Sequence, residues 1–178
     1  IILPEIRQAE AQYMPYITKN LLQSTGNWGA VRVVPRPSDA VDLTVSGKIM
    51  ASTGEELILS LTVKDATGKE WFTNEYTTLA SKYGYEASTA RDRDPFQRVY
   101  KDFANHLLHY RQGLSEKEIT NIRATAELKF AKAFSPDAFS QHIAINENGE
   151  YQVNRLPAEN DPQLARVRQV REREYLFI

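Results

Sequence analysis

Three short runs between residues 41 and 77 alternate apolar and polar side chains, and this feature constrains the fold most. In the middle run, every second residue from Leu57 to Val63 is apolar, and the third run carries Trp71 and Tyr76. Glycine-containing turns at 52–55 and 65–68 separate the runs. Period-two alternation is typical of half-buried strands, and short glycine turns join antiparallel neighbours. The pattern therefore predicts a three-stranded antiparallel meander with one face buried.

The flanking segments predict helices to cover that face. A first helix over about 4–24 places these apolar residues at helical spacing: Ile6, Ala9, Tyr13, Ile17 and Leu21. Pro15 inside this run predicts a kink or two short helices, because proline cannot donate a backbone hydrogen bond. A helix after Asp94-Pro95 presents a second apolar stripe and ends at Gly113; the stripe is Phe96, Tyr100, Phe103, Leu107 and Tyr110. The β-branched run 30–34 predicts one more strand.

The remainder of the chain predicts a helix–hairpin–helix extension. Ser115 and Glu118 have the spacing of a capping box at the start of a helix that runs to about residue 134. Apolar alternation on both sides of Asn148-Gly149 predicts a hairpin, and Asp161-Pro162 caps a last helix with Leu164, Val167 and Val170 inward. The expected fold class is therefore α+β, with an antiparallel sheet of about four strands backed by two helices. We expect an α/β sandwich domain over 1–113 and a helical extension with a hairpin over 114–178.

Composition narrows the classes of partner. The 22 Lys and Arg residues against 23 Asp and Glu leave a net charge of −1, so no overall positive field favours nucleic acid or an anionic membrane. No run approaches the roughly 18 apolar residues that a membrane-spanning helix needs. The absence of cysteine excludes thiol catalysis, cysteine-based zinc sites and disulfides within the chain. The chain begins at Ile1, so we expect any signal peptide or lipid-anchor cysteine to lie upstream of it.

Catalytic and metal-binding motifs give little support to an enzyme. Asp102, His106 and His109 share a predicted helix, but His109 falls on its solvent face and the other histidine, His142, is far along the chain. A zinc site usually needs three or four protein ligands, so we expect no metal. No Gly-x-Ser-x-Gly motif occurs, and Gly26 and Gly29 precede a predicted strand where a phosphate-binding loop would precede a helix. We therefore expect a non-catalytic protein with no cofactor.

The long segment 80–94 is the preferred contact surface. It carries the candidate binding residues Tyr83, Tyr85, Arg91 and Arg93. Tyrosine and arginine are over-represented in interface hot spots, and long loops are often functional. A linker whose tyrosines fold back on the sheet is an equally good interpretation. The arginine-rich run 166–174 is a second candidate for an acidic protein partner, although Glu172 and Glu174 offset part of its charge, and Arg168 and Glu172 have i,i+4 spacing.

The order of helix, strands and helix over about residues 5–112 resembles a group of bacterial envelope proteins. The resemblance is carried by "ITKNLLQSTGNWGAVRVVP", "VDLTVSGKIMASTGEELILSLTVKDATGKEWFTNEYTT" and "DPFQRVYKDFANHLLHY". It is to the amino-terminal domain of TolB, the curli-secretion lipoprotein CsgG and the penicillin-binding-protein activator LpoB. The matching positions are Asp42, Gly47, Asp65 and Gly68. The segment 80–94 and the chain after Gly113 have no counterpart in that pattern.

The resemblance implies an accessory or scaffolding (lipo)protein of the cell envelope that binds another envelope protein or assembly. It implies a periplasmic location, outer-membrane anchoring through an upstream lipid, and contact with the membrane only through that anchor. One alternative is a module that binds peptidoglycan or another glycan, with Trp28, Trp71 or the tyrosines of segment 80–94 as stacking platforms. A second alternative is a hydrolase without a recognisable motif. Nucleic acid is not an expected partner.

Overall fold

The computed structural model describes residues 4–38, 41–80 and 94–177 and shows an α+β protein. Within these ranges there are five helices, one three-stranded sheet and one two-stranded sheet. The chain divides into two compact units: Ile1–Val33, Ser46–Leu61 and Thr73–Gly113 form unit 1, and Val34–Val45, Thr62–Phe72 and Leu114–Ile178 form unit 2. Each unit has its own buried side chains and is described by itself.

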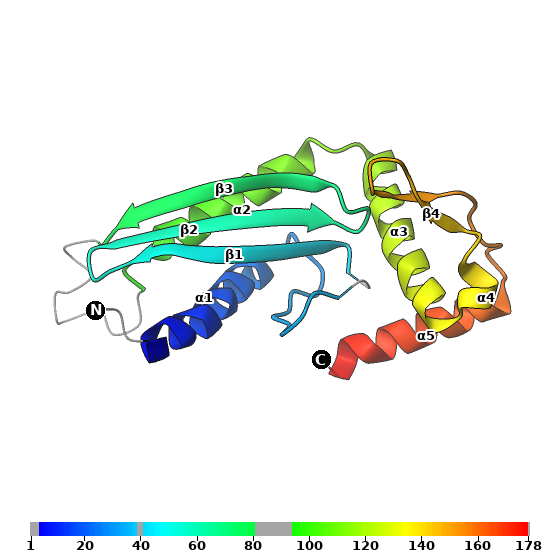
Figure 1. The fold of residues 1–178 in the computed structure, drawn as a ribbon, viewed down its shortest axis with the longest axis horizontal. Coiled ribbons are helices and arrows are strands. Elements are labelled where there is room, and N and C mark those ends of the chain that lie inside the picture. Colours follow the sequence, from blue (N-terminus) through cyan, green and yellow to red (C-terminus); the bar gives the residue numbers. More distant parts are fainter. Residues whose placement is uncertain (1–3, 39–40, 81–93, 178) are drawn as a thin grey trace. The chain divides into compact units, whose positions relative to one another are not determined.

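The larger sheet is the meander that the alternating pattern predicts. Strands β1 (Leu43–Ser52), β2 (Glu56–Asp65) and β3 (Glu70–Leu79) lie side by side in chain order (Figure 1). The first turn is closed by the Thr53 N–H, which donates to the Glu56 carbonyl at 2.8 Å. The second turn contains Gly68, whose φ of +91° is a conformation that glycine adopts without steric cost. The predicted antiparallel meander is confirmed.

The predicted fourth strand, at residues 30–34, is wrong. This segment has no strand conformation, and Val33 is 47% exposed. The Gln23 side chain explains why: its amide oxygen accepts from the Val31 N–H at 3.0 Å, and its amide nitrogen donates to the Gly29 carbonyl at 3.4 Å. A side chain thus occupies backbone groups that a neighbouring strand would use, and the prolines at 35 and 37 offer no N–H for a ladder.

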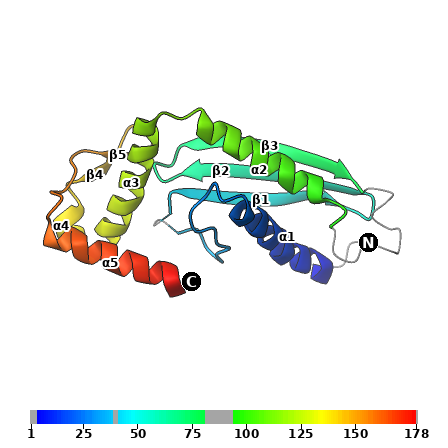
Figure 2. The same cartoon turned by 180° about the vertical axis from the view of Figure 1, so that it is seen from behind.

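In unit 1, helices α1 (Pro4–Ser24) and α2 (Gln97–Gln112) lie on the same face of the sheet (Figure 2). Apolar side chains of β2 and α2 form the core between them: Leu57, Leu59, Leu61, Val99, Tyr100, Phe103 and Leu107. Tyr76 of β3 meets Phe103 edge-on, with ring centroids 5.7 Å apart. The predicted stripe of α2 therefore faces the sheet, and the helix ends before Gly113 as expected.

Pro15 predicts a kink or two short helices; helix α1 is continuous through Pro15, so the division into two helices is wrong. The apolar residues whose spacing predicts this helix are not the ones that it buries. The buried residues of α1 are Met14 and Leu22, whereas Ile6 is 51% exposed and Tyr13 is 50% exposed. Apolar residues occur around most of the circumference of this helix, so their spacing does not decide which side packs on the sheet.

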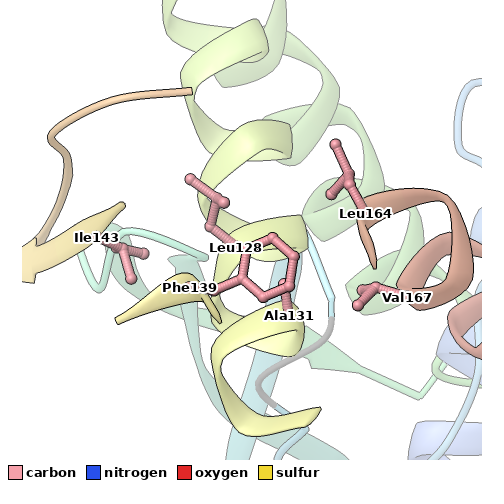
Figure 3. Close-up of a cluster of buried hydrophobic side chains, with 6 residues drawn as sticks. All are labelled: Leu128, Ala131, Phe139, Ile143, Leu164 and Val167. Atoms are coloured by element: carbon pink, nitrogen blue, oxygen red, sulfur yellow. The ribbon is translucent and has the colours of Figure 1, made fainter. Parts of the chain in front are cut away.

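Unit 2 contains α3 (Glu116–Phe134), α4 (Pro136–Phe139), β4 (Ile143–Ile145), β5 (Tyr151–Val153) and α5 (Pro162–Phe177). The predicted capping box is present, because Ser115 and Glu118 each bind the backbone N–H of the other. Strands β4 and β5 pair antiparallel, with Ile143 opposite Val153. Figure 3 shows the apolar cluster of this unit: Leu128, Ala131, Phe139, Ile143, Leu164 and Val167. Helix α5 buries Leu164 and Val167 as expected, and Val170 is half-buried.

Candidate binding surface

The four candidate binding residues of the sequence analysis, Tyr83, Tyr85, Arg91 and Arg93, lie outside the described residues. Their role stays a prediction. The described part of unit 1 carries a different surface that could bind a partner.

This surface is the side of α1 that does not pack on the sheet. Its apolar residues, which we call the α1 face, are Ile6, Ala9, Tyr13 and Tyr16. Ala9 is exposed, and the three larger side chains are 51%, 50% and 54% exposed in chain order. Met14 and Leu22 anchor the opposite side of the helix in the core, and the Glu10 carboxylate accepts a hydrogen bond of 2.6 Å from the Ser52 hydroxyl of β1. These contacts fix which side of α1 is presented to solvent.

A groove of about 270 Å³ runs beside the α1 face, between α1 and α2. It is lined by apolar and uncharged polar side chains: Ile17, Asn20, Leu21, Ser24, Gln97 and Tyr100. Tyr100 is buried, and this burial, followed by the nearby Asp94 carboxylate, raises the pKa of its hydroxyl. Burial and Asp94 also raise the pKa of Tyr13.

The α1 face and the groove have the composition of a protein-binding surface. Tyrosine offers a large rigid ring with a polar end, and exposed apolar groups that gather on one side of a helix are typical of docking sites. The groove contains no charged side chain among its lining residues. The helical spacing of Ile6, Ala9 and Tyr13 predicts the helix but does not show which of these side chains lie outside the core.

Two of the three histidines, His106 and His142, have structural partners. The Tyr76 hydroxyl lies 2.7 Å from His106 Nδ1, and burial followed by the charge of Asp102 raises the pKa of Tyr76. His142 is buried, with Nδ1 2.7 Å from the Arg155 carbonyl oxygen. His109 is exposed. Among residues 4–38, 41–80 and 94–177, no three His, Asp or Glu side chains gather as metal ligands.

The arginines of α5 are engaged with acidic residues of unit 2. Arg168 Nε lies 2.8 Å from a carboxylate oxygen of Glu127 on α3. The i,i+4 spacing in the sequence suggests a different partner, Glu172. Arg171 lies 3.8 Å from Asp42, with 18% of its side chain exposed. An open cleft of about 290 Å³ at this place is lined by two arginines and two glutamates: Arg168, Arg171, Glu127 and Glu172. Its charges balance, which weakens the case for an acidic partner here.

The tryptophans are poor stacking platforms for a sugar. Trp71 is 8% exposed, and its indole N–H donates to Asp65 Oδ2 at 2.8 Å, so its ring belongs to the core. This corrects its assignment as a platform. Trp28 is half-buried, and the Arg111 guanidinium lies 5.3 Å from its ring centroid, which covers one side of the ring.

No family model, no curated protein and no solved structure matches this chain. Within the described part of the chain, the helices are all too short or too polar to cross a membrane.

Proposed function

We propose that this chain is a non-catalytic accessory or scaffolding protein of the bacterial cell envelope that binds another protein through the α1 face. The single observation that carries the proposal is the exposure of Ile6, Tyr13 and Tyr16 on one side of a helix that the sheet holds in place. The resemblance to the TolB amino-terminal, CsgG and LpoB group supports the envelope setting, in the periplasm and with an upstream lipid anchor.

The contacts of unit 1 suit a docking role. A binding surface works best on a rigid element, because less conformational entropy is lost when the partner binds. Helix α1 is fixed by Met14 and Leu22 in the core and by the Glu10–Ser52 hydrogen bond. Its exposed tyrosines can therefore meet a partner without reorganising the sheet.

A protein partner fits the groove beside the α1 face better than a glycan or a charged ligand. The groove beside α1 is lined by aliphatic, amide and hydroxyl groups, and its aromatic member, Tyr100, is buried and offers no open ring to a sugar. A helical or extended peptide segment can instead place apolar side chains between Tyr13 and Leu21.

The test is affinity capture from bacterial envelope extracts, followed by a binding measurement with the purified captured protein. We expect Tyr13→Ser combined with Tyr16→Ser to weaken binding by about 2 kcal/mol or more. The matched control is Leu79→Ser, which removes an exposed apolar side chain from β3 of the same unit, where Leu79 is 69% exposed.

The control should bind as well as the unmodified protein, and all variants should keep their melting temperature. Equal binding by the tyrosine variant and the unmodified protein would refute the proposed surface. A loss of thermal stability in the tyrosine variant would show instead that these rings stabilise the fold.

A further inference from the structure

The spacing of the α1 face is that of a coiled-coil seam. Its four residues follow one another at intervals of three, four and three, and Asn20, which lines the groove, continues the series after another four. Apolar residues at this spacing form a straight stripe that a second helix can cover. We propose that the partner that covers the α1 face is the α1 helix of a second copy of this chain, in antiparallel orientation. This inference rests on the proposed function, because it uses the same surface.

The antiparallel arrangement brings the apolar residues of the two copies together. When Ile6 of one copy lies opposite Tyr16 of the other, Ala9 lies opposite Tyr13, and the two-fold symmetry repeats both pairs. In each pair, a tyrosine meets a smaller side chain. The small Ala9 leaves room for the Tyr13 ring, as interlocking of side chains across a helix pair requires.

The flanking charges select this orientation. Glu5, Gln12 and Lys19 lie seven residues apart along one border of the seam. In the antiparallel pair, Glu5 faces Lys19 of the other copy with an offset of about 3 Å along the helix axis, and Gln12 faces Gln12. The interface then has an ion pair at each end. Each orientation brings Glu10 near a glutamate of the other copy: Glu5 in the parallel pair and Glu10 itself in the antiparallel pair. The ion pairs between Glu5 and Lys19, which the antiparallel pair forms and the parallel pair does not, therefore decide the orientation.

The environment of these residues is compatible with the pairing. Glu5 is exposed. Lys19 Nζ lies 5.6 Å from the Tyr16 ring centroid, so the lysine already lies along the border of the seam. Glu10, on the other border, directs its carboxylate to Ser52 of the sheet. The apolar contact covers only two heptads, below the size of a permanent interface, so the dimer forms at high local concentration, as two membrane-tethered copies would provide.

The test is sedimentation velocity of the full chain over a concentration series that extends into the millimolar range. The unmodified protein should shift from monomer to dimer. Glu5→Lys and Lys19→Glu, each alone, place like charges at both ends of the pair, so each variant should dimerise at least about tenfold more weakly. Both positions lie on the surface of α1, and circular dichroism should show unchanged helix content.

A mixture of the two single variants gives the decisive result. One variant then carries lysine at both positions and the other glutamate at both, so mixed dimers regain both ion pairs and should form as readily as unmodified dimers. The double variant should also regain dimerisation. A wild-type chain that stays monomeric throughout the series, or a mixture that associates no better than its components, would overturn the inference.

These failures are distinguishable from failure of the proposed function. If the wild-type chain is monomeric but the Tyr13 and Tyr16 substitutions still abolish binding of a captured envelope protein, the α1 face binds a different partner and the self-association is wrong. If neither association nor capture depends on these residues, the proposed function is wrong as well.

Discussion

Replacement of Asp65 by alanine should strongly destabilise unit 2, because its carboxylate satisfies buried donors at the β2–β3 turn. Asp65 is 8% exposed. It accepts hydrogen bonds from the Thr67 N–H at 2.8 Å, from the Trp71 indole N–H at 2.8 Å, and from the Thr67 hydroxyl. The hydroxyl can rotate to another acceptor, but the two N–H groups are fixed in place and would remain buried without this acceptor.

The expected magnitude follows from these two donors. A buried donor that loses its partner costs about 1–3 kcal/mol, so Asp65→Ala should lower the free energy of unfolding by about 4 kcal/mol. Asp65→Asn keeps one acceptor oxygen at nearly the same place and should cost about half as much. Lys64→Ala, at the exposed neighbouring position, is the control and should change stability by less than about 0.5 kcal/mol.

The assay is urea denaturation followed by tryptophan fluorescence in a Trp28→Phe background. Trp71 is then the remaining tryptophan, and it contacts the substituted side chain directly. A loss below about 1 kcal/mol for Asp65→Ala would refute the reasoning, since it would mean that the two N–H groups do not depend on this carboxylate.

Three further predictions concern single contacts. Gly68→Ala should lower the free energy of unfolding by about 1–2 kcal/mol, measured by heat or urea, because φ at this position is +91°. The control is Gly54→Ala, at a turn with no positive φ and no atom within 4 Å of an added Cβ, which should lower it by less than half as much. Tyr76→Phe should cost about 1 kcal/mol in urea unfolding, because it removes the 2.7 Å hydrogen bond to His106 and leaves the ring in place. Hydrogen bonding from the Ser115 backbone lowers the pKa of Glu118 below its ordinary 4.5. The native chain should therefore be more stable than Glu118→Gln above about pH 4.5, and this difference should disappear as the pH falls through the lower pKa of the folded state. A stability difference that grows on acidification would contradict this sign.

The sequence predicts the meander and α2 well because both have one clearly apolar side. In β2, alternation leaves a single choice of buried face, and Leu57 and Val63 are indeed fully buried. In α2, the stripe through Tyr100, Phe103 and Leu107 has polar neighbours on the other side. Local pattern and tertiary packing agree in these elements, so the pattern alone is sufficient.

The predictions for residues 4–34 failed because long-range packing decides there. Apolar residues surround α1, so only the position of the sheet determines that Met14 is buried and Tyr13 is exposed. The segment 30–34 has strand-like residues, but the Gln23 side chain binds its backbone. The α1 face could not be predicted for the same reason. Exposed and buried apolar stripes on a helix have the same spacing in the sequence, and they differ only in whether another element packs on them.

The central claim, that the α1 face binds a protein, is tested most directly by site-specific photo-cross-linking in living bacterial cells. A benzophenone amino acid is placed at Tyr13 and, as a control, at Phe134 of α3, which is 45% exposed. The account predicts a defined protein adduct from position 13, either a dimer of this chain or a complex with another envelope protein, and none from position 134. Adducts from position 134 with none from position 13 would contradict it.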